Sequence, residues 1–124
     1  MADYTKINLG ELEDMAPKHG HGDVMQTRFA SKALELKESG LGYQILAPNA
    51  ELPFKHKHKK QEEIFLILSG TGTMMLDQET IKVKPLDTVR VGANTVRSLK
   101  ADDNELAFVI FGAPATKETD FVMD

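Results

Sequence analysis

The chain lacks cysteine and tryptophan altogether, and the missing cysteine excludes several kinds of chemistry. Without thiols there is no disulfide framework, no zinc–thiolate site and no cysteine nucleophile. A chain that needs no disulfides suits a reducing compartment, and we therefore expect a cytoplasmic protein.

Long apolar runs are missing as well. The longest, at 64–68 and 106–112, are far shorter than the roughly 20 residues that cross a bilayer. Residues 1–14 are acidic and lack the basic start and apolar stretch of a signal peptide. We expect a soluble protein without a membrane partner.

Blocks of basic residues are also scarce. The net charge is −4, and the longest run of lysine or arginine is the pair Lys59 and Lys60. Domains that bind nucleic acid usually carry a basic patch, so we expect no nucleic-acid partner. The length of 124 residues fits a single domain, and 41 % hydrophobic with 27 % charged residues is typical of a globular protein.

What the sequence does contain is a series of short segments rich in β-branched and aromatic residues, separated by turn residues. We expect strands at 24–30, 42–47, 64–68, 72–76, 81–83, 88–91, 95–99 and 105–111. Strands at this spacing predict an all-β sandwich or barrel, since crossover helices have no room between them. The expected organisation is an irregular N-terminal arm at 1–22, a barrel at 23–113 and a C-terminal tail at 114–124.

Two segments are open to a helical interpretation. Residues 11–15 fit one helical turn that stops near Pro17. Residues 32–38, KALELKE, have helical propensity but also alternate apolar and charged residues, so they predict either a helix or a strand.

The alternation along the expected strands predicts which side chains face inward. The inward candidates are Phe65, Ile67, Val89, Val91 and Phe108. The opposite face of the 64–68 strand carries Ile64, Leu66 and Leu68, and an apolar face of this kind needs to be covered by a second sheet or a partner.

The four histidines form two H-x-H pairs, His19 with His21 and His56 with His58. Residues i and i+2 of a strand point to the same face, so each pair can place two imidazoles beside one cation. Lysines alternate with the second pair and fit the outward face of that strand. Glu63, just before the 64–68 strand, can add a carboxylate ligand. The first pair, among glycines, is either a second metal site or a solvated loop.

The second histidine pair begins a pattern that resembles the first motif of the cupin superfamily. The motif reads H-x-H, four residues, Glu, six residues, Gly, and His56, His58, Glu63 and Gly70 fall on its positions. Ala50 stands where the motif usually opens with glycine. Because motif spacing varies by one residue, Gln61 and Glu62 are alternatives to Glu63, although Glu63 keeps the six-residue gap.

The resemblance covers residues 42–112 and implies a double-stranded jelly-roll barrel. It also implies that His56, His58 and Glu63 are ligands of a divalent transition metal, for which iron, manganese, nickel, zinc and copper all occur in the superfamily. Small single-domain cupins are commonly homodimers, and the same assembly is implied here.

The second cupin motif is where the sequence departs from the family. Its positions are occupied by Leu86, Gly92, Asn94, Arg97 and Ala101, where the motif has Gly, Pro, Gly, His and Asn. We expect Asn94 to take the positive φ of the motif's second glycine. The fourth metal ligand is replaced by Arg97, whose guanidinium cannot be deprotonated to bind a metal.

Two interpretations of Arg97 follow, and they lead to different functions. In one, Arg97 binds a small anionic substrate beside a three-ligand metal site, and the protein is an oxygenase, isomerase or decarboxylase. In the other, Arg97 pairs with Glu63 in the place of the metal. The protein is then a ligand-binding or sensing module with a vestigial site, or a scaffold.

Overall fold

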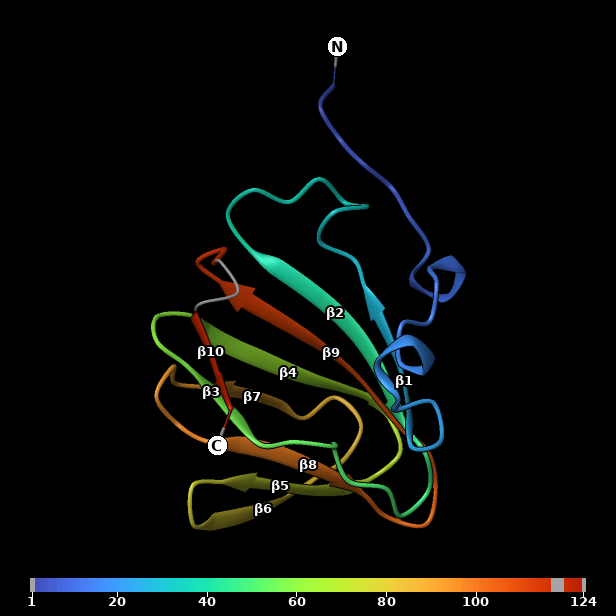
Figure 1. The fold of residues 1–124 in the computed structure, drawn as a ribbon, viewed down its shortest axis with the longest axis vertical. Coiled ribbons are helices and arrows are strands. Elements are labelled where there is room, and N and C mark those ends of the chain that lie inside the picture. Colours follow the sequence, from blue (N-terminus) through green and yellow to red (C-terminus); the bar gives the residue numbers. More distant parts are fainter. Residues whose placement is uncertain (1, 117–119, 124) are drawn as a thin grey trace.

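The structure, a computed structural model that describes residues 2–116 and 120–123, is built from two five-stranded antiparallel sheets (Figure 1). The first sheet has the order β1-β2-β9-β4-β7 and comprises β1 (Met25–Phe29), β2 (Gly40–Leu46), β9 (Leu106–Ala113), β4 (Glu62–Ser69) and β7 (Thr88–Val91). The second has the order β10-β3-β8-β5-β6 and comprises β10 (Phe121–Met123), β3 (His56–His58), β8 (Arg97–Ala101), β5 (Gly72–Leu76) and β6 (Glu79–Val83). The predicted all-β jelly-roll is confirmed.

Within residues 2–116, helix is confined to two single turns in the N-terminal arm, Leu9–Glu11 and Pro17–His19. In the described part of the chain, no helix is long and apolar enough to cross a membrane. The helical turn predicted at 11–15 is therefore not formed there, and the two observed turns lie on either side of that segment. The Asp14 carboxylate explains this, because it accepts backbone N–H groups of Ala16 and Thr27 and ties the intervening segment to β1.

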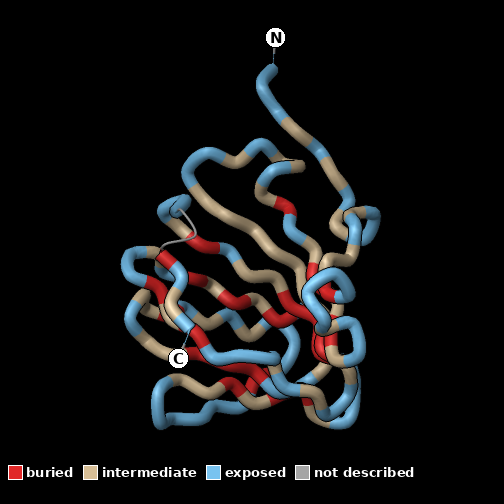
Figure 2. Tube along the Cα trace, viewed as in Figure 1, coloured by how far each residue is buried: buried red, intermediate tan, exposed pale blue. Residues whose placement is uncertain are grey.

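The core lies between the sheets, and buried positions alternate with more exposed ones along β1, β4 and β5 (Figure 2). Phe65 and Phe108 are fully buried, with ring centroids 6.1 Å apart. Burial of a side chain of this size contributes about 1.5–3 kcal/mol to folding. Ile67 and Val91 are buried as predicted, and Val89 is partly buried against the same cluster.

The opposite face of β4 is apolar and points away from the second sheet. Leu66 lies between Val109 of β9 and Thr88 of β7 on this face, and Leu68 and Phe111 are 42 % and 41 % exposed. The second sheet therefore does not cover it. A homodimer that would cover it stays a prediction.

Residues 32–38 are neither the helix nor the strand that their pattern predicts. The segment is a series of turns, in which the Leu34 N–H donates to the Ala30 carbonyl and the Leu36 N–H to the Ser31 carbonyl. Glu35 has a φ of 59°, a left-handed conformation that ends any helix after one turn. Both expectations for this segment were wrong.

The turn between β4 and β5 requires its glycine. Gly70 has a φ of 81°, and a Cβ at this position would collide with the carbonyl oxygen of Glu105. The glycine that closes the H-x-H motif therefore serves the close approach of two backbone segments.

A second left-handed position carries leucine instead of glycine. Leu86 has a φ of 73°, and the Asp87 N–H donates to the Lys84 carbonyl over 3.0 Å, so residues 84–87 have the features of a type II turn. Asn94, a described residue, does not have a positive φ. The expected exchange of asparagine for glycine was therefore wrong, and the strain falls on Leu86.

Leu86→Gly should stabilise the protein by about 0.5–1 kcal/mol. A left-handed conformation costs a leucine about 1–2 kcal/mol, part of which is offset by the backbone entropy of glycine in the unfolded chain. Little packing is lost, since the side chain is 78 % exposed. Urea denaturation measures the change, and Leu86→Ala, which keeps the Cβ, should stay near wild type. A glycine variant less stable than the alanine variant would contradict the argument.

Candidate metal centre

Both histidines of the second pair project from β3 to the same side. His56 and His58 are buried while Lys57 between them is half-buried, and the two rings lie 5.1 Å apart. The register places His56 opposite Arg97 of β8 on one side and opposite Met123 of β10 on the other. The alternation that predicted a shared face is therefore present in the fold.

Glu63 brings a carboxylate to these histidines from the other sheet. It lies at the start of β4, and its Oε1 is 3.4 Å from His56 Nε2 while its Oε2 is 3.4 Å from His58 Nε2. Potential ligand atoms of the three residues all lie within 4.8 Å of one another. The two alternatives to Glu63 point elsewhere. Glu62 is exposed near Arg90, and the Gln61 amide donates to a backbone carbonyl.

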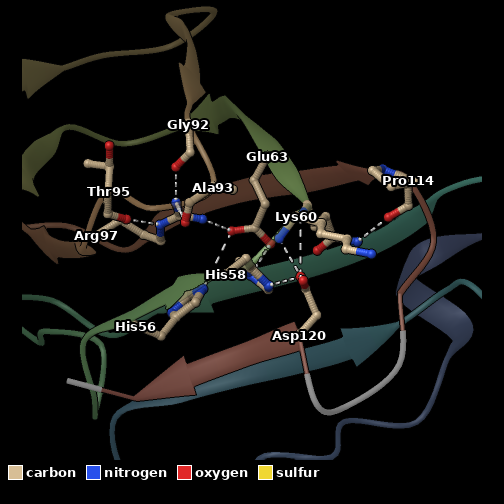
Figure 3. Close-up of polar contacts among 11 residues, drawn as sticks. His56, His58, Lys60, Glu63, Gly92, Ala93, Thr95, Arg97, Pro114 and Asp120 are labelled. Atoms are coloured by element: carbon tan, nitrogen blue, oxygen red, sulfur yellow. Dashed lines mark hydrogen bonds and ion pairs between the residues drawn. The ribbon is translucent and has the colours of Figure 1, made fainter.

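Arg97 is fully buried behind Glu63 (Figure 3). Its Nη1 donates to Glu63 Oε1 over 2.8 Å, and its remaining contacts are with the backbone carbonyls of Thr95, Gly92 and Ala93. These carbonyls belong to the loop between β7 and β8. The sequence predicted that Arg97 contacts either Glu63 or a substrate, and in the structure its guanidinium contacts Glu63.

A fifth polar side chain at this site, Asp120, was not predicted from the sequence. Its Oδ2 lies 3.0 Å from His58 Nδ1, and it is brought there by the pairing of β10 with β3. The carboxylate also accepts the backbone N–H groups of Lys60 and Gln61. The segment interpreted as a tail, residues 114–124, contains three acidic residues, and its sequence pattern does not distinguish Asp120 from the other two.

The charges of the site favour ionised carboxylates. Burial raises the pKa of Glu63, but the neighbouring imidazoles of His56 and His58 outweigh this effect and hold that pKa well below its usual range. Burial likewise raises the pKa of Asp120, and the backbone N–H groups and His58 lower it further than burial raises it. Both groups therefore remain available as anions.

The hydrogen bonds of His58 test whether these residues suit a cation. Ionised Asp120 accepts a hydrogen bond from Nδ1, so the lone pair of a neutral His58 is on Nε2. That Nε2 is buried without a hydrogen-bond partner among the described residues and faces the Glu63 carboxylate. A lone pair and a carboxylate repel each other unless a proton or a metal cation lies between them. Ligands roughly 2.1 Å from a common ion at a tetrahedral angle are about 3.4 Å apart, so the residues fit a divalent metal.

A cavity of about 730 Å³ opens onto the three residues. Its lining is largely apolar, with Phe54 and Phe121 beside the histidines and the polar side chains of Thr27 and Gln44 further along. The described lining residues include neither lysine nor arginine. Arg97 does not line the cavity, so its predicted contact with a substrate is not supported by its position.

The first histidine pair also borders this cavity. His19 is exposed and His21 is half-buried, with its ring 6.1 Å from that of Phe54. Neither belongs to a cluster of three potential ligands in the described part of the chain. The alternative of a second metal site therefore has no structural support, and the pair is part of the cavity wall.

The fold and this constellation agree with a comparison of the chain with known proteins. Residues 42–112, more than half of the chain, match the family described as the Cupin domain. The chain belongs to the cupin family. The resemblance seen in the H-x-H motif is thereby confirmed, although Arg97 stands at the position of the motif's fourth ligand, a histidine.

Relatives of this cupin include an enzyme and proteins without a stated function. The quercetin 2,3-dioxygenase of Bacillus subtilis is 30 % identical over 105 residues, covering 77 % of this chain and 31 % of the dioxygenase. The uncharacterized protein MJ1618 of Methanocaldococcus jannaschii is 35 % identical over 57 residues, 46 % of each chain. The crystal structure of a cupin protein from Bacteroides fragilis, BF4112, has a TM-score of 0.76 and 25 % identity, covering 94 % of this chain and 89 % of that one. The chain spans less than half the length of the two curated relatives.

Proposed function

We propose that this cupin binds one divalent transition-metal ion through His56, His58 and Glu63 and acts on a small molecule held in the adjoining cavity. The observation that carries the proposal is the buried Nε2 of His58, which has no hydrogen-bond partner among the described residues and faces an ionised carboxylate at 3.4 Å. Two imidazoles and one carboxylate leave coordination positions open, a ligand set that suits non-haem Fe(II). When bound, the ion would supply Lewis-acid or redox chemistry at the end of the cavity.

The cavity lining indicates how a substrate would be held. Its apolar walls favour a molecule with an apolar body, oriented by hydrogen bonds to groups such as Thr27 and Gln44. The Gln44 Oε1 atom is buried and without a partner in the described structure, so it can accept a hydrogen bond from a ligand. An anionic group would meet its positive charge at the metal site, because Arg97 lies behind Glu63.

A second candidate function is a non-catalytic, ligand-binding cupin whose metal site is vestigial. The Arg97–Glu63 pair favours it, since a fully buried guanidinium at 2.8 Å already neutralises the carboxylate. The pair engages Oε1, however, and His58 faces Oε2. The cavity would serve binding in either case.

Protein purified without a histidine tag should contain close to one equivalent of a first-row transition metal. Metal that binds only the folded state stabilises it by mass action, by about 2.7 kcal/mol when the free metal is at 100 times its Kd. A chelator should therefore lower the melting temperature, and re-addition of metal should restore it. Elemental analysis and thermal denaturation measure the two effects. A metal-free protein with an unchanged melting curve in chelator would favour the vestigial site.

A further inference from the structure

The side chain of Asp120, the residue next to β10, is held against the candidate site by three separate contacts. Asp120 accepts a hydrogen bond from the Lys60 backbone N–H at Oδ1, over 2.7 Å, and from the Gln61 N–H at Oδ2, over 3.3 Å. His58 Nδ1 lies 3.0 Å from the same Oδ2. The side chain is only 7 % exposed, so these groups are its main surroundings.

These contacts determine which group can occupy the position. Two of the three partners are backbone N–H groups, which only donate, and they engage both carboxylate oxygens. An ionised carboxylate accepts at both oxygens, whereas an amide presents an N–H on one side. An unprotonated His58 Nδ1 would place a lone pair against Oδ2. The arrangement is satisfied when Nδ1 carries the hydrogen.

We infer that Asp120 is a positioning residue of the metal centre, which holds His58 in the tautomer with hydrogen on Nδ1 and the Nε2 lone pair directed at Glu63. The inference rests on the proposed metal site for its role, although the tautomer itself exists without metal. Ligating histidines commonly donate their other N–H to a carboxylate, which fixes the ring and increases its basicity. Here that carboxylate comes from the far end of the described chain.

The neighbouring residue acts on the other histidine. The Phe121 ring is stacked on His56, with centroids 4.6 Å apart and an interplanar angle of 19°, and it meets His58 edge to face at 5.6 Å. His56 Nδ1 has no hydrogen-bond partner among the described residues, so this stacking is its main lateral support. Residues 120 and 121 thus constrain both imidazoles from one side, opposite Arg97.

The test begins with the metal-free protein in mildly alkaline buffer, where the imidazole nitrogens are distinguished by ¹⁵N NMR. Wild-type His58 should show a protonated Nδ1 and an unprotonated Nε2. In Asp120→Asn, Oδ1 is expected to stay on the Lys60 N–H, which puts the amide N–H against His58 Nδ1 and moves the hydrogen to Nε2. Asp102→Asn is the matched control, because Asp102 accepts a hydrogen bond from Thr71 on an exposed part of the surface.

Zn²⁺ titration provides the second measurement. Asp120→Asn should bind Zn²⁺ about 10–100-fold more weakly than wild type, the range for removal of such a carboxylate, and Asp102→Asn should bind like wild type. A wild-type His58 protonated at Nε2 overturns the inference even if Asp120→Asn fails to fold. Unchanged tautomer and affinity in the folded variant also overturn it. If wild type shows the expected tautomer but binds no Zn²⁺, the proposed metal function fails while the positioning of His58 stands.

Discussion

Replacing Arg97 with methionine should lower the free energy of unfolding of the metal-free protein by about 3–5 kcal/mol, the usual cost of breaking a buried ion pair from one side. Methionine keeps much of the side-chain length but none of the donors. The loss leaves the Glu63 carboxylate, and backbone carbonyls of the loop before β8, without the partner they have in wild type. Urea denaturation in the presence of a chelator measures the effect.

The chain offers a matched control on its surface. Arg90 lies 3.9 Å from Glu62, and both side chains are more than half exposed. Exposed pairs contribute about 0–1 kcal/mol, so Arg90→Met should change stability by no more than that. Adding Glu63→Gln to Arg97→Met should recover part of the loss, since it removes the unpaired charge. An Arg97→Met variant within 1 kcal/mol of wild type would show that the pair is of little structural importance.

His56→Ala should abolish metal loading and lower the melting temperature mainly when metal is present. Removing a group that hydrogen-bonds a ligating side chain lowers metal affinity by about 10–100-fold, so removing the ligand itself should lower it more than 100-fold. The stabilisation that wild type gains from metal then disappears, so that chelator removes most of the difference between the two proteins. Isothermal titration with Zn²⁺ and melting curves with and without chelator measure these effects.

His21→Ala is the matched control for this substitution, because His21 borders the same cavity but lies outside the three-residue cluster. It should bind Zn²⁺ like wild type. Wild-type affinity in His56→Ala would falsify the assignment of His56 as a ligand. An equal loss in His21→Ala would mean that the metal binds elsewhere in the cavity.

Local patterns in the sequence predicted the centre of this site, because each depends on neighbouring residues. The alternation of histidine and lysine places His56 and His58 on one face of a strand, and the apolar strand that follows places Glu63 on its inward side. The same alternation predicted the core positions of β4 and β9. The role of these residues as ligands stays a prediction.

The other features of the site and fold depend on contacts between residues far apart in the sequence or on backbone angles, and no local sequence pattern predicts these. Asp120 reaches His58 only because a three-residue strand pairs with another three-residue strand across 62 positions. Such strands are too short to show periodicity. For Arg97, the sequence left two orientations open, and the carbonyls of the loop before β8 decide between them. The pattern of residues 32–38 was ambiguous, and the left-handed Glu35 is not encoded by hydrophobic periodicity.

The pairing of β10 with β3 would link two equilibria, the docking of β10 on the sheet and the binding of metal at the candidate site. In the described sheet, β10 is an edge strand whose neighbour is β3, and Asp120 and Phe121 each contact a candidate ligand. If docking raises metal affinity 10–100-fold, thermodynamic reciprocity requires metal to strengthen docking by the same factor, about 1.4–2.7 kcal/mol. A bound metal would then keep β10 paired with β3 for a larger fraction of the time, although β10 lies far along the chain from the ligands themselves.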